Sequence, residues 1–241
     1  MNTLSPAAML LVVLVIGFVI SSLVYQLTIK PRRELAAFAQ SRGLIILPED
    51  ANGELKKKIE ENFNIPQSGE YRDIITLWFG SGEAYFYRVV PHSERTSTTG
   101  TTSGSPHHFI AVFMPTGMRE RAFAAPAVPV SGKFAEKIVS YILEHAFGAK
   151  DIKILNIKDQ YPDFGQKYNV FATDEKNARD IILSEDVIST LMAYPMKRAA
   201  NIMFSPKGFA VDIEPLLKKR DEMDRLIVWA EDLARVLKRN L

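Results

Sequence analysis

The sequence predicts an α+β protein: a single N-terminal transmembrane helix, then a cytosolic domain of antiparallel β-hairpins packed with helices, with a long C-terminal helix. Three observations lead to this fold class. No Asp, Glu, Lys or Arg occurs before Lys30, and the run from Ala7 to Tyr25 is almost wholly apolar. Segments rich in aromatic and β-branched residues are then separated by turn residues, which is typical of strands. Finally, apolar residues keep helical spacing after Pro215 to the end of the chain.

The apolar run is long enough to cross a bilayer. Its nineteen residues span roughly 28 Å as a helix, close to the thickness of the hydrocarbon core. The alternative, a cleaved signal peptide, requires a basic start, a shorter apolar stretch and small residues at the cleavage site. The opening MNTLSP carries no basic side chain, and no Ala-x-Ala follows the run. We therefore expect residues 1–29 to form an uncleaved anchor.

Basic residues flank the anchor on one side only. None precedes it, and four follow it: Lys30, Arg32, Arg33 and Arg42. The positive-inside rule then predicts a single-pass protein of the inner (cytoplasmic) membrane, with its N-terminus outside and its C-terminal domain in the cytoplasm. Gly17 and Ser21 are small residues at a spacing that favours helix packing within a membrane. The expected partners are the lipid bilayer and either a membrane protein or a second copy of this chain.

Two further regions follow the predicted anchor. Residues 30–65 are expected to form a juxtamembrane helical segment, and residues 66–241 a soluble α+β domain. Within the first region, residues 32–42 and 53–63 both have apolar residues at helical spacing. The earlier of these helices is expected to bury Leu35, Phe38 and Ala39 on one face.

Strands dominate the next part of the chain. Residues 73–79 and 83–90 flank Gly80-Ser81-Gly82, which predicts a β-hairpin, and a further strand is expected over residues 109–114. Residues 93–106 consist almost wholly of Ser, Thr, Gly and Pro and contain no large hydrophobic side chain, so they predict a flexible loop. Such a loop can be a lid, a docking element or a tolerated insertion.

The second half predicts a regular succession of elements. A helix is expected over residues 134–147, with Gly148 as its C-terminal cap. Strands are expected over residues 151–157 and 167–173. Pro and Gly at the second and fourth positions of Ser205–Gly208 predict a hairpin turn, and Pro215 opens the final helix.

The stretch from Phe164 to Met192 crowds Asp, Glu, Lys, Arg and Asn residues, which suggests a site. Most of these residues have a simpler role. Asp174 and Ser184 are each placed to cap a short helix, and the acidic residues after Ser184 suit the positive end of its helix. The stretch is therefore expected to shape the fold more than to perform chemistry.

The same stretch resembles a group of bacterial membrane-anchored proteins with a domain of unknown function, over roughly residues 150–241. The pattern is FGQKYNVFATDEKNARDIILSEDVISTLM followed by NIMFSPKGFAVDI and a closing helix. The matching positions are Phe164, Tyr168, Val170, Asp174, Ala178 and Arg179. Glu185 departs from the Pro that often follows the second cap. The resemblance implies a membrane anchor and brings no assigned activity.

A search for chemical motifs favours no enzyme class. Cysteine is absent, which excludes disulfides, thiolate metal sites and cysteine nucleophiles. A net charge of +2 gives no basic field for nucleic acid. His107 and His108 are neighbours on a predicted strand, so they face opposite sides and cannot readily share a metal ion. We expect no catalytic residue, cofactor or metal, and name four possible recognition residues for an unknown ligand: Arg179, Asp180, His107 and His108.

Two functions remain open. The first is a non-enzymatic interaction protein, an accessory subunit at the cytoplasmic face of a membrane complex. The second is a membrane-tethered enzyme or ligand sensor acting on a cytoplasmic or lipid-derived substrate. A deep polar pocket holding Arg179 or His145 would favour the second function. An exposed apolar patch, or an anchor packed on neighbouring helices, would favour the first.

Overall fold

The computed structural model describes residues 15, 18, 21–22, 25, 30–48, 52–63, 69–91, 107–127, 152–213 and 220–241. The chain divides into two compact units, Met1–Gly43 and Leu44–Leu241. In the first unit, α2 (Lys30–Ser41) buries one apolar face, as its spacing predicts. The buried residues are Leu35, Phe38 and Ala39.

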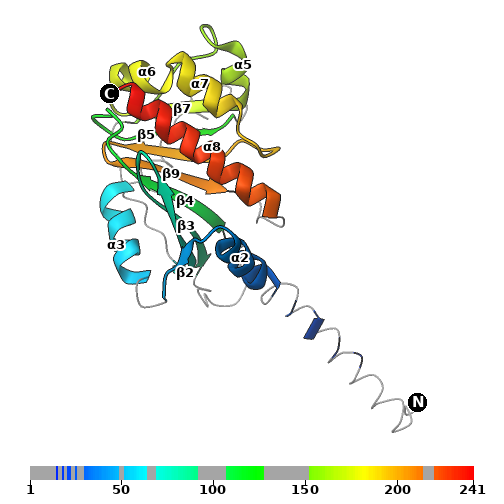
Figure 1. Cartoon of the computed structure of the whole chain (residues 1–241). Coiled ribbons are helices and arrows are strands. Elements are labelled where there is room, and N and C mark those ends of the chain that lie inside the picture. The colour runs from blue at the N-terminus through cyan, green and yellow to red at the C-terminus, as the bar shows by residue number, and fades with distance from the viewer. Residues whose placement is uncertain are drawn as a thin grey trace, which may run out of the picture. The chain divides into compact units, whose positions relative to one another are not determined.

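One antiparallel sheet of nine strands forms the centre of the second unit, with strand order β1-β2-β3-β4-β9-β8-β5-β7-β6 (Figure 1). The strands are β1 (Ile45–Ile46), β2 (Gly69–Phe79), β3 (Gly82–Pro91), β4 (His107–Phe113), β5 (Ala122–Pro126), β6 (Lys153–Ile154), β7 (Tyr168–Ala172), β8 (Asn201–Ser205) and β9 (Gly208–Ile213). The long strands β2, β3 and β4 lie side by side, and each edge of the sheet is a strand of two residues.

Helices pack on this sheet. They are α3 (Asn52–Phe63), α5 (Pro162–Lys167), α6 (Glu175–Ile182), α7 (Glu185–Met192) and α8 (Arg220–Arg239). Figure 1 shows the long helix α8 lying across the sheet. The indole Nε1 of Trp229 donates a hydrogen bond of 2.7 Å to the Thr190 carbonyl, which joins α8 to α7.

The sheet is buried on both faces. On β4, Phe109 and Ala111 belong to the cluster under α3, while Ile110 and Val112 point to the opposite face and are fully buried. An antiparallel sheet covered on both sides loses the polar–apolar alternation along its central strands. For this reason β4 appears in the sequence as a continuous apolar run.

Both hairpins predicted from turn residues are confirmed. Phe79 pairs with Gly82 across the β2–β3 turn, and Ser205 pairs with Gly208 across the β8–β9 turn. Gly208 has φ 149°, a conformation that side chains rarely adopt. Turns of two residues depend on local sequence alone, which explains why they could be predicted.

The predicted fold class is wrong in its arrangement of strands. It describes hairpins packed with helices, whereas the strands join into one large sheet. The hairpins are fused because β9 pairs with β4, and β5 pairs with both β8 and β7. These pairings join segments far apart in the chain, which turn residues do not indicate. The helix expected over residues 134–147 and the loop expected over residues 93–106 lie outside the described residues.

The predicted transmembrane helix is also contradicted. Across the residues that the structure describes, no helix has both the length and the apolar character needed to cross a membrane. The single-pass topology and the inner-membrane location were derived from that helix, so they are corrected with it. Of residues 1–29, the structure describes Val15, Phe18, Ser21, Ser22 and Tyr25, and Gly17 lies outside the described residues. The prediction came from the length and hydropathy of the run and from its flanking residues.

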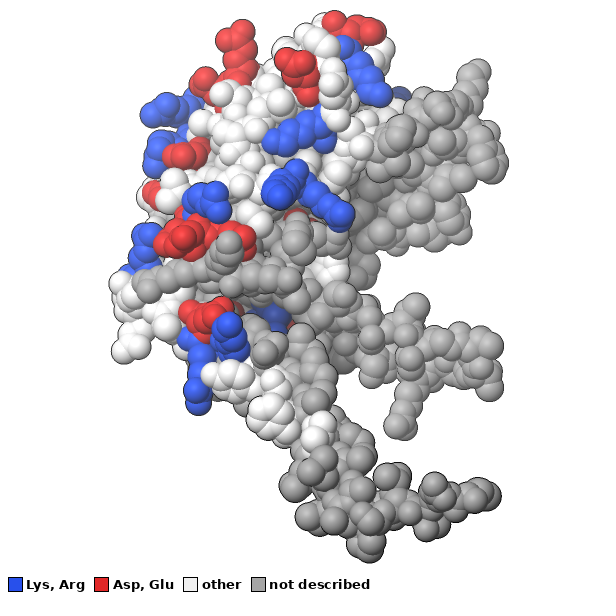
Figure 2. All heavy atoms as spheres, turned by 90° about the vertical axis from the view of Figure 1, so that its right-hand side faces the viewer, with Lys and Arg blue, Asp and Glu red and all other residues white. Residues whose placement is uncertain are grey.

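Charged side chains of both signs lie on the surface. On the face shown in Figure 2, several Lys and Arg side chains lie near the centre, and Asp and Glu side chains lie among and above them. This face therefore carries no field of a single sign, in agreement with the small net charge of +2.

Candidate interaction surface

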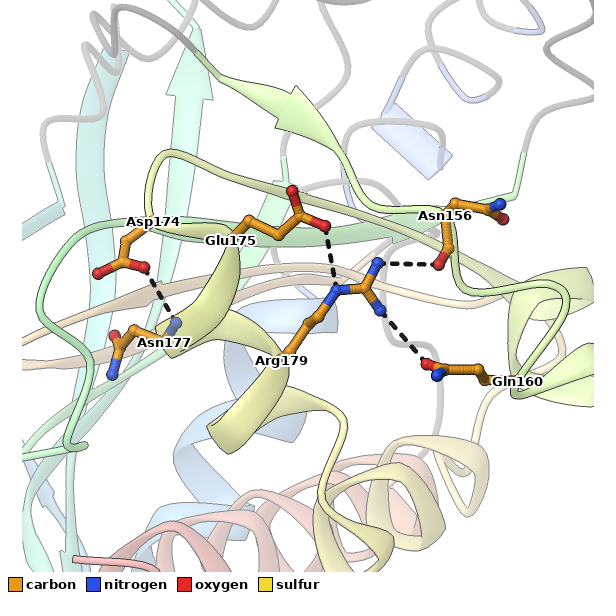
Figure 3. A network of polar contacts seen from close by, with 6 residues as sticks. All are labelled: Asn156, Gln160, Asp174, Glu175, Asn177 and Arg179. Atoms are coloured by element: carbon orange, nitrogen blue, oxygen red, sulfur yellow. Dashed lines mark hydrogen bonds and ion pairs between the residues drawn. The ribbon is translucent and has the colours of Figure 1, made fainter.

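Arg179 is held in a network of contacts within the fold (Figure 3). Its Nε lies 3.1 Å from a carboxylate oxygen of Glu175, and its two terminal nitrogens donate to the Asn156 carbonyl at 3.0 Å and to Gln160 Oε1 at 3.4 Å. The guanidinium thus ties α6 to the connection between β6 and α5. Its fork of donors is already used by these groups. Asp180 is exposed on the same helix.

The two predicted caps behave differently. Asp174 is the N-cap of α6, and its side chain accepts a hydrogen bond of 3.0 Å from the Asn177 backbone N–H (Figure 3), as predicted. Ser184 is the N-cap residue of α7, but its side chain makes no capping bond. Its hydroxyl instead donates to the Ile181 carbonyl at 2.9 Å, and accepts from the Asn240 amide at 3.0 Å. The predicted mechanism is therefore right for Asp174 and wrong for Ser184.

The two adjacent histidines face opposite sides of the sheet. His107 stacks on Phe109 in the α3 face and its Nδ1 lies 3.1 Å from an Asp212 carboxylate oxygen. His108 is buried beside Phe86, and burial, reinforced by the nearby charge of Arg88, lowers its pKa to about 4. Among the residues that the structure describes, no three His, Asp or Glu side chains are grouped so that they could hold a metal ion. Neutral and buried, His108 behaves as a core residue.

A small open pocket of about 280 Å³ lies between the β2–β3 turn and α8. Its cations already have partners. Arg235 contacts Glu231 at 3.7 Å and Asp232 at 2.7 Å, and Lys238 Nζ lies 3.5 Å from the Gly80 carbonyl. The volume is at the lower limit for small-molecule sites, so the pocket does not define a ligand.

Exposed apolar side chains gather at the β1 edge of the sheet. Trp78 is 75% exposed, Ile45 is 57% exposed and Ile46 is 45% exposed. Ile45 pairs with Thr76, which lies two residues before Trp78, so Ile45 and Trp78 are on the same face of the sheet. Diagonal neighbours of this kind lie about 7–8 Å apart. Ile46 pairs with Ile75 and therefore points to the opposite face. We call Ile45 and Trp78 the edge patch.

The charges beside the edge patch are paired. Glu83 lies opposite Trp78 on β3 and forms an ion pair with Lys58 of α3 and a hydrogen bond with the Tyr85 hydroxyl. Burial acts to raise the pKa of Glu83, but these two partners outweigh it and hold the pKa below its usual value. Lys58 Nζ also lies 4.4 Å from the centre of the Phe113 ring. The rim of the patch is therefore polar and close to neutral.

Sequence analysis missed the edge patch, although one signal was present. Leu77 and Phe79 are buried, and Trp78 between them must point to the opposite side of the strand. Its neighbour on that side is Thr76, which is only half-buried. Period-two alternation therefore placed a tryptophan beside a polar residue. The two-residue strand β1 carries no such pattern.

Comparisons with known proteins show similarity of fold alone. No family model matches the chain, and no curated protein does. Among solved structures, the chain is similar to the crystal structure of the mycobacterial trehalose monomycolate transport factor A, TtfA. The TM-score is 0.54 at 11% sequence identity, and the match covers 86% of this chain and 94% of TtfA. The two chains thus have a similar overall fold over most of their lengths.

Proposed function

We propose that this chain is a non-enzymatic interaction protein, an accessory component that binds a protein partner through the edge patch. The observation that carries the proposal is Trp78, which is 75% exposed on a strand whose adjacent residues are buried. Tryptophan is enriched at the energetic centres of protein interfaces. Its large apolar surface gains most of its binding energy when a partner excludes water from it.

The surroundings of Trp78 support a protein partner. Ile45 extends the apolar surface, and the Lys58–Glu83 pair supplies a polar rim. An apolar centre with a polar rim is the usual anatomy of a protein–protein interface. TtfA, which has a similar fold, is described as a transport factor, and this also supports an accessory role.

The predicted recognition residue Arg179 supports this function less. Its guanidinium contacts Glu175, Gln160 and Asn156 within the fold. A ligand would have to displace these contacts. The edge patch has no such competing contacts in the described part of the chain, since its side chains are exposed.

Site-specific photo-crosslinking in the native host tests the proposal. A photoreactive phenylalanine analogue replaces Trp78 in one variant and Val228 in the control. Val228 is also an exposed apolar residue, 53% exposed on α8. We expect a discrete adduct with another protein from position 78 and none from position 228, and we expect Ile45→Ser to weaken that adduct. The same adducts from both positions, or none from position 78, would refute the proposal.

A further inference from the structure

We infer that the edge patch binds a proline-rich segment of its partner, in the polyproline II conformation, packed on the face of the sheet over Thr76. This inference rests on the proposed function and specifies the chemistry of the partner. In this recognition mode a preformed extended segment packs its proline rings against exposed aromatic side chains, and no strand pairing is needed.

Three large side chains flank Thr76 on the face of the sheet that carries α3. Thr76 pairs with Ile45 on one side and with Tyr85 on the other, so the three form a row across β1, β2 and β3. Residues paired in this way have Cβ atoms about 4.5–5.5 Å apart. Trp78 follows two residues later on β2, about 7 Å along the same face. We call Ile45, Thr76, Trp78 and Tyr85 the platform, which lies wholly within the second compact unit.

The centre of the platform has its smallest side chain. Thr76 is half-buried, whereas both residues of the edge patch beside it are exposed. The ring of Tyr85 is held in place, because its hydroxyl donates a hydrogen bond to Glu83 and the ring packs edge-on against Phe113, with 6.0 Å between the ring centres. A compact pyrrolidine ring over Thr76 therefore contacts large side chains on three sides.

The backbone beside Trp78 has no room for an added strand. Leu47 N–H donates to the Ile74 carbonyl, and β1 pairs with the next two residues of β2, so this edge is already covered as far as Thr76. The strand β2 then ends at Phe79. The platform thus binds through side chains, and its partner needs a backbone that requires no hydrogen bonds from this surface. Polyproline II meets this requirement, since its backbone stays solvated and proline has no N–H.

The size of the platform favours a short preformed segment. Within β1 and β2, Ile45 and Trp78 are the apolar residues that are more than half exposed on this face, whereas two folded proteins need an interface of roughly 1,000 Å². A helix of about two turns is marginal in water and loses much conformational entropy when it forms on binding. A proline-rich segment already populates its bound conformation and loses less.

The spacing of the platform predicts the spacing of the prolines. Ile45 and Tyr85 lie two strand spacings apart, about 9.5 Å. Polyproline II repeats every three residues with a rise of about 3.1 Å, so prolines three positions apart lie on one side about 9.3 Å apart. A segment that crosses the strands therefore places one proline beside Ile45 and the next beside Tyr85. Because Lys58 pairs with Glu83 at the rim, the segment needs no charge there.

Peptide selection on the purified full chain tests this chemistry. Random twelve-residue peptides displayed on phage are selected against the chain, and enriched peptides are synthesised and their Kd measured. We expect prolines three positions apart, a loss of affinity of about tenfold or more for Trp78→Ala, and no change for Val228→Ala. Circular dichroism and thermal unfolding verify that both variants are folded.

Two further measurements locate the peptide and its prolines. The chain has two tryptophans, so after labelling with 5-fluorotryptophan the fluorine resonance of exposed Trp78 should shift on binding, and that of Trp229, which is 5% exposed, should not. Replacing either proline of the peptide by alanine should weaken binding about fivefold or more, because alanine restores an N–H and chain flexibility. Alanine at the two intervening positions should change the affinity less than about twofold, since those residues face away from the platform.

Several results would overturn the inference. They are no enrichment, enriched peptides without the paired prolines, affinity that Trp78→Ala leaves unchanged, and a shift of the Trp229 resonance alone. A dimer in sedimentation that Trp78→Ala dissociates would also overturn it, because a second copy would then occupy the platform. In each of these cases a discrete crosslink from position 78 to another protein would still support the proposed function.

Discussion

Replacing Gly208 by alanine should destabilise the sheet at its centre. Gly208 begins β9 directly after the turn, pairs with Ser205 on one side and with Phe113 of β4 on the other, and has φ 149°. A Cβ built on Gly208 would lie 1.9 Å from the Val112 carbonyl oxygen and 3.0 Å from the Val112 carbonyl carbon. These neighbours are backbone atoms of a central strand, so they cannot rotate away as a flexible side chain would.

The expected cost follows from two contributions. An L-residue held in a rarely populated backbone conformation costs about 1–3 kcal/mol. Relief of the clash requires β9 to move from β4, which weakens one or two ladder hydrogen bonds at about 1 kcal/mol each. We therefore expect Gly208→Ala to lower the free energy of unfolding by about 2–5 kcal/mol.

Gly80 provides the matched control, because it lies in the other predicted hairpin turn and is not among the glycines with positive φ. A Cβ at Gly80 would meet nothing within 4 Å. Gly80→Ala should therefore change stability by less than about 1 kcal/mol. Urea unfolding followed by circular dichroism measures both variants. A loss below 1 kcal/mol for Gly208→Ala, or equal losses for the two variants, would refute the steric explanation.

Three other predictions concern caps, contacts and pH. Asp174→Ala should lower the free energy of unfolding by about 1 kcal/mol, and Asn at position 174 should keep most of the native stability. At position 184, Asn should be no more stable than Ala, since Ser184 forms no cap bond. The urea midpoints of the four variants test both expectations. Arg179→Lys should cost about 0.5–1 kcal/mol, because lysine cannot reproduce the contacts to Asn156 and Gln160 from a partly exposed position; an unchanged unfolding midpoint would contradict this. Burial lowers the pKa of His108 from 6.5 to about 4, so the unfolded chain binds more protons than the folded chain between these pH values. About 3 kcal/mol of the free energy of unfolding is therefore present above pH 6.5 and is lost as the pH falls toward 4. His108→Gln should flatten the dependence of the free energy of unfolding on pH in that window.

Local signals predicted the turns and one cap well. The hairpin turns at Gly80-Ser81 and Pro206-Lys207 require particular residues at particular positions, and the structure confirms both. Asp174 caps α6 through a bond to Asn177, three residues later in the chain. The cap at Ser184 failed because its hydroxyl donates to the Ile181 carbonyl and accepts from Asn240, which is close in space and distant in sequence.

Long-range pairing could not be predicted in the same way. Nothing in β5 indicates that it lies between β8 and β7, because its partners are chosen by packing of the whole sheet. The edge strands β1 and β6 have two residues each, too few for a period-two pattern. An edge patch that depends on β1 was therefore hidden, although the alternation around Trp78 could have been noticed.

Trp78 has no explanation within the described fold, and this distinguishes it from the other conspicuous residues. Arg179 and Asp174 break no local rule, because each has partners that account for its position. An exposed tryptophan on a long strand gains little free energy from folding, since its surface stays in contact with water. It also lies at an edge where charge would protect the sheet from other chains. Local features that conflict with folding are expected at functional positions, and here the conflict is removed only when a second surface covers the indole.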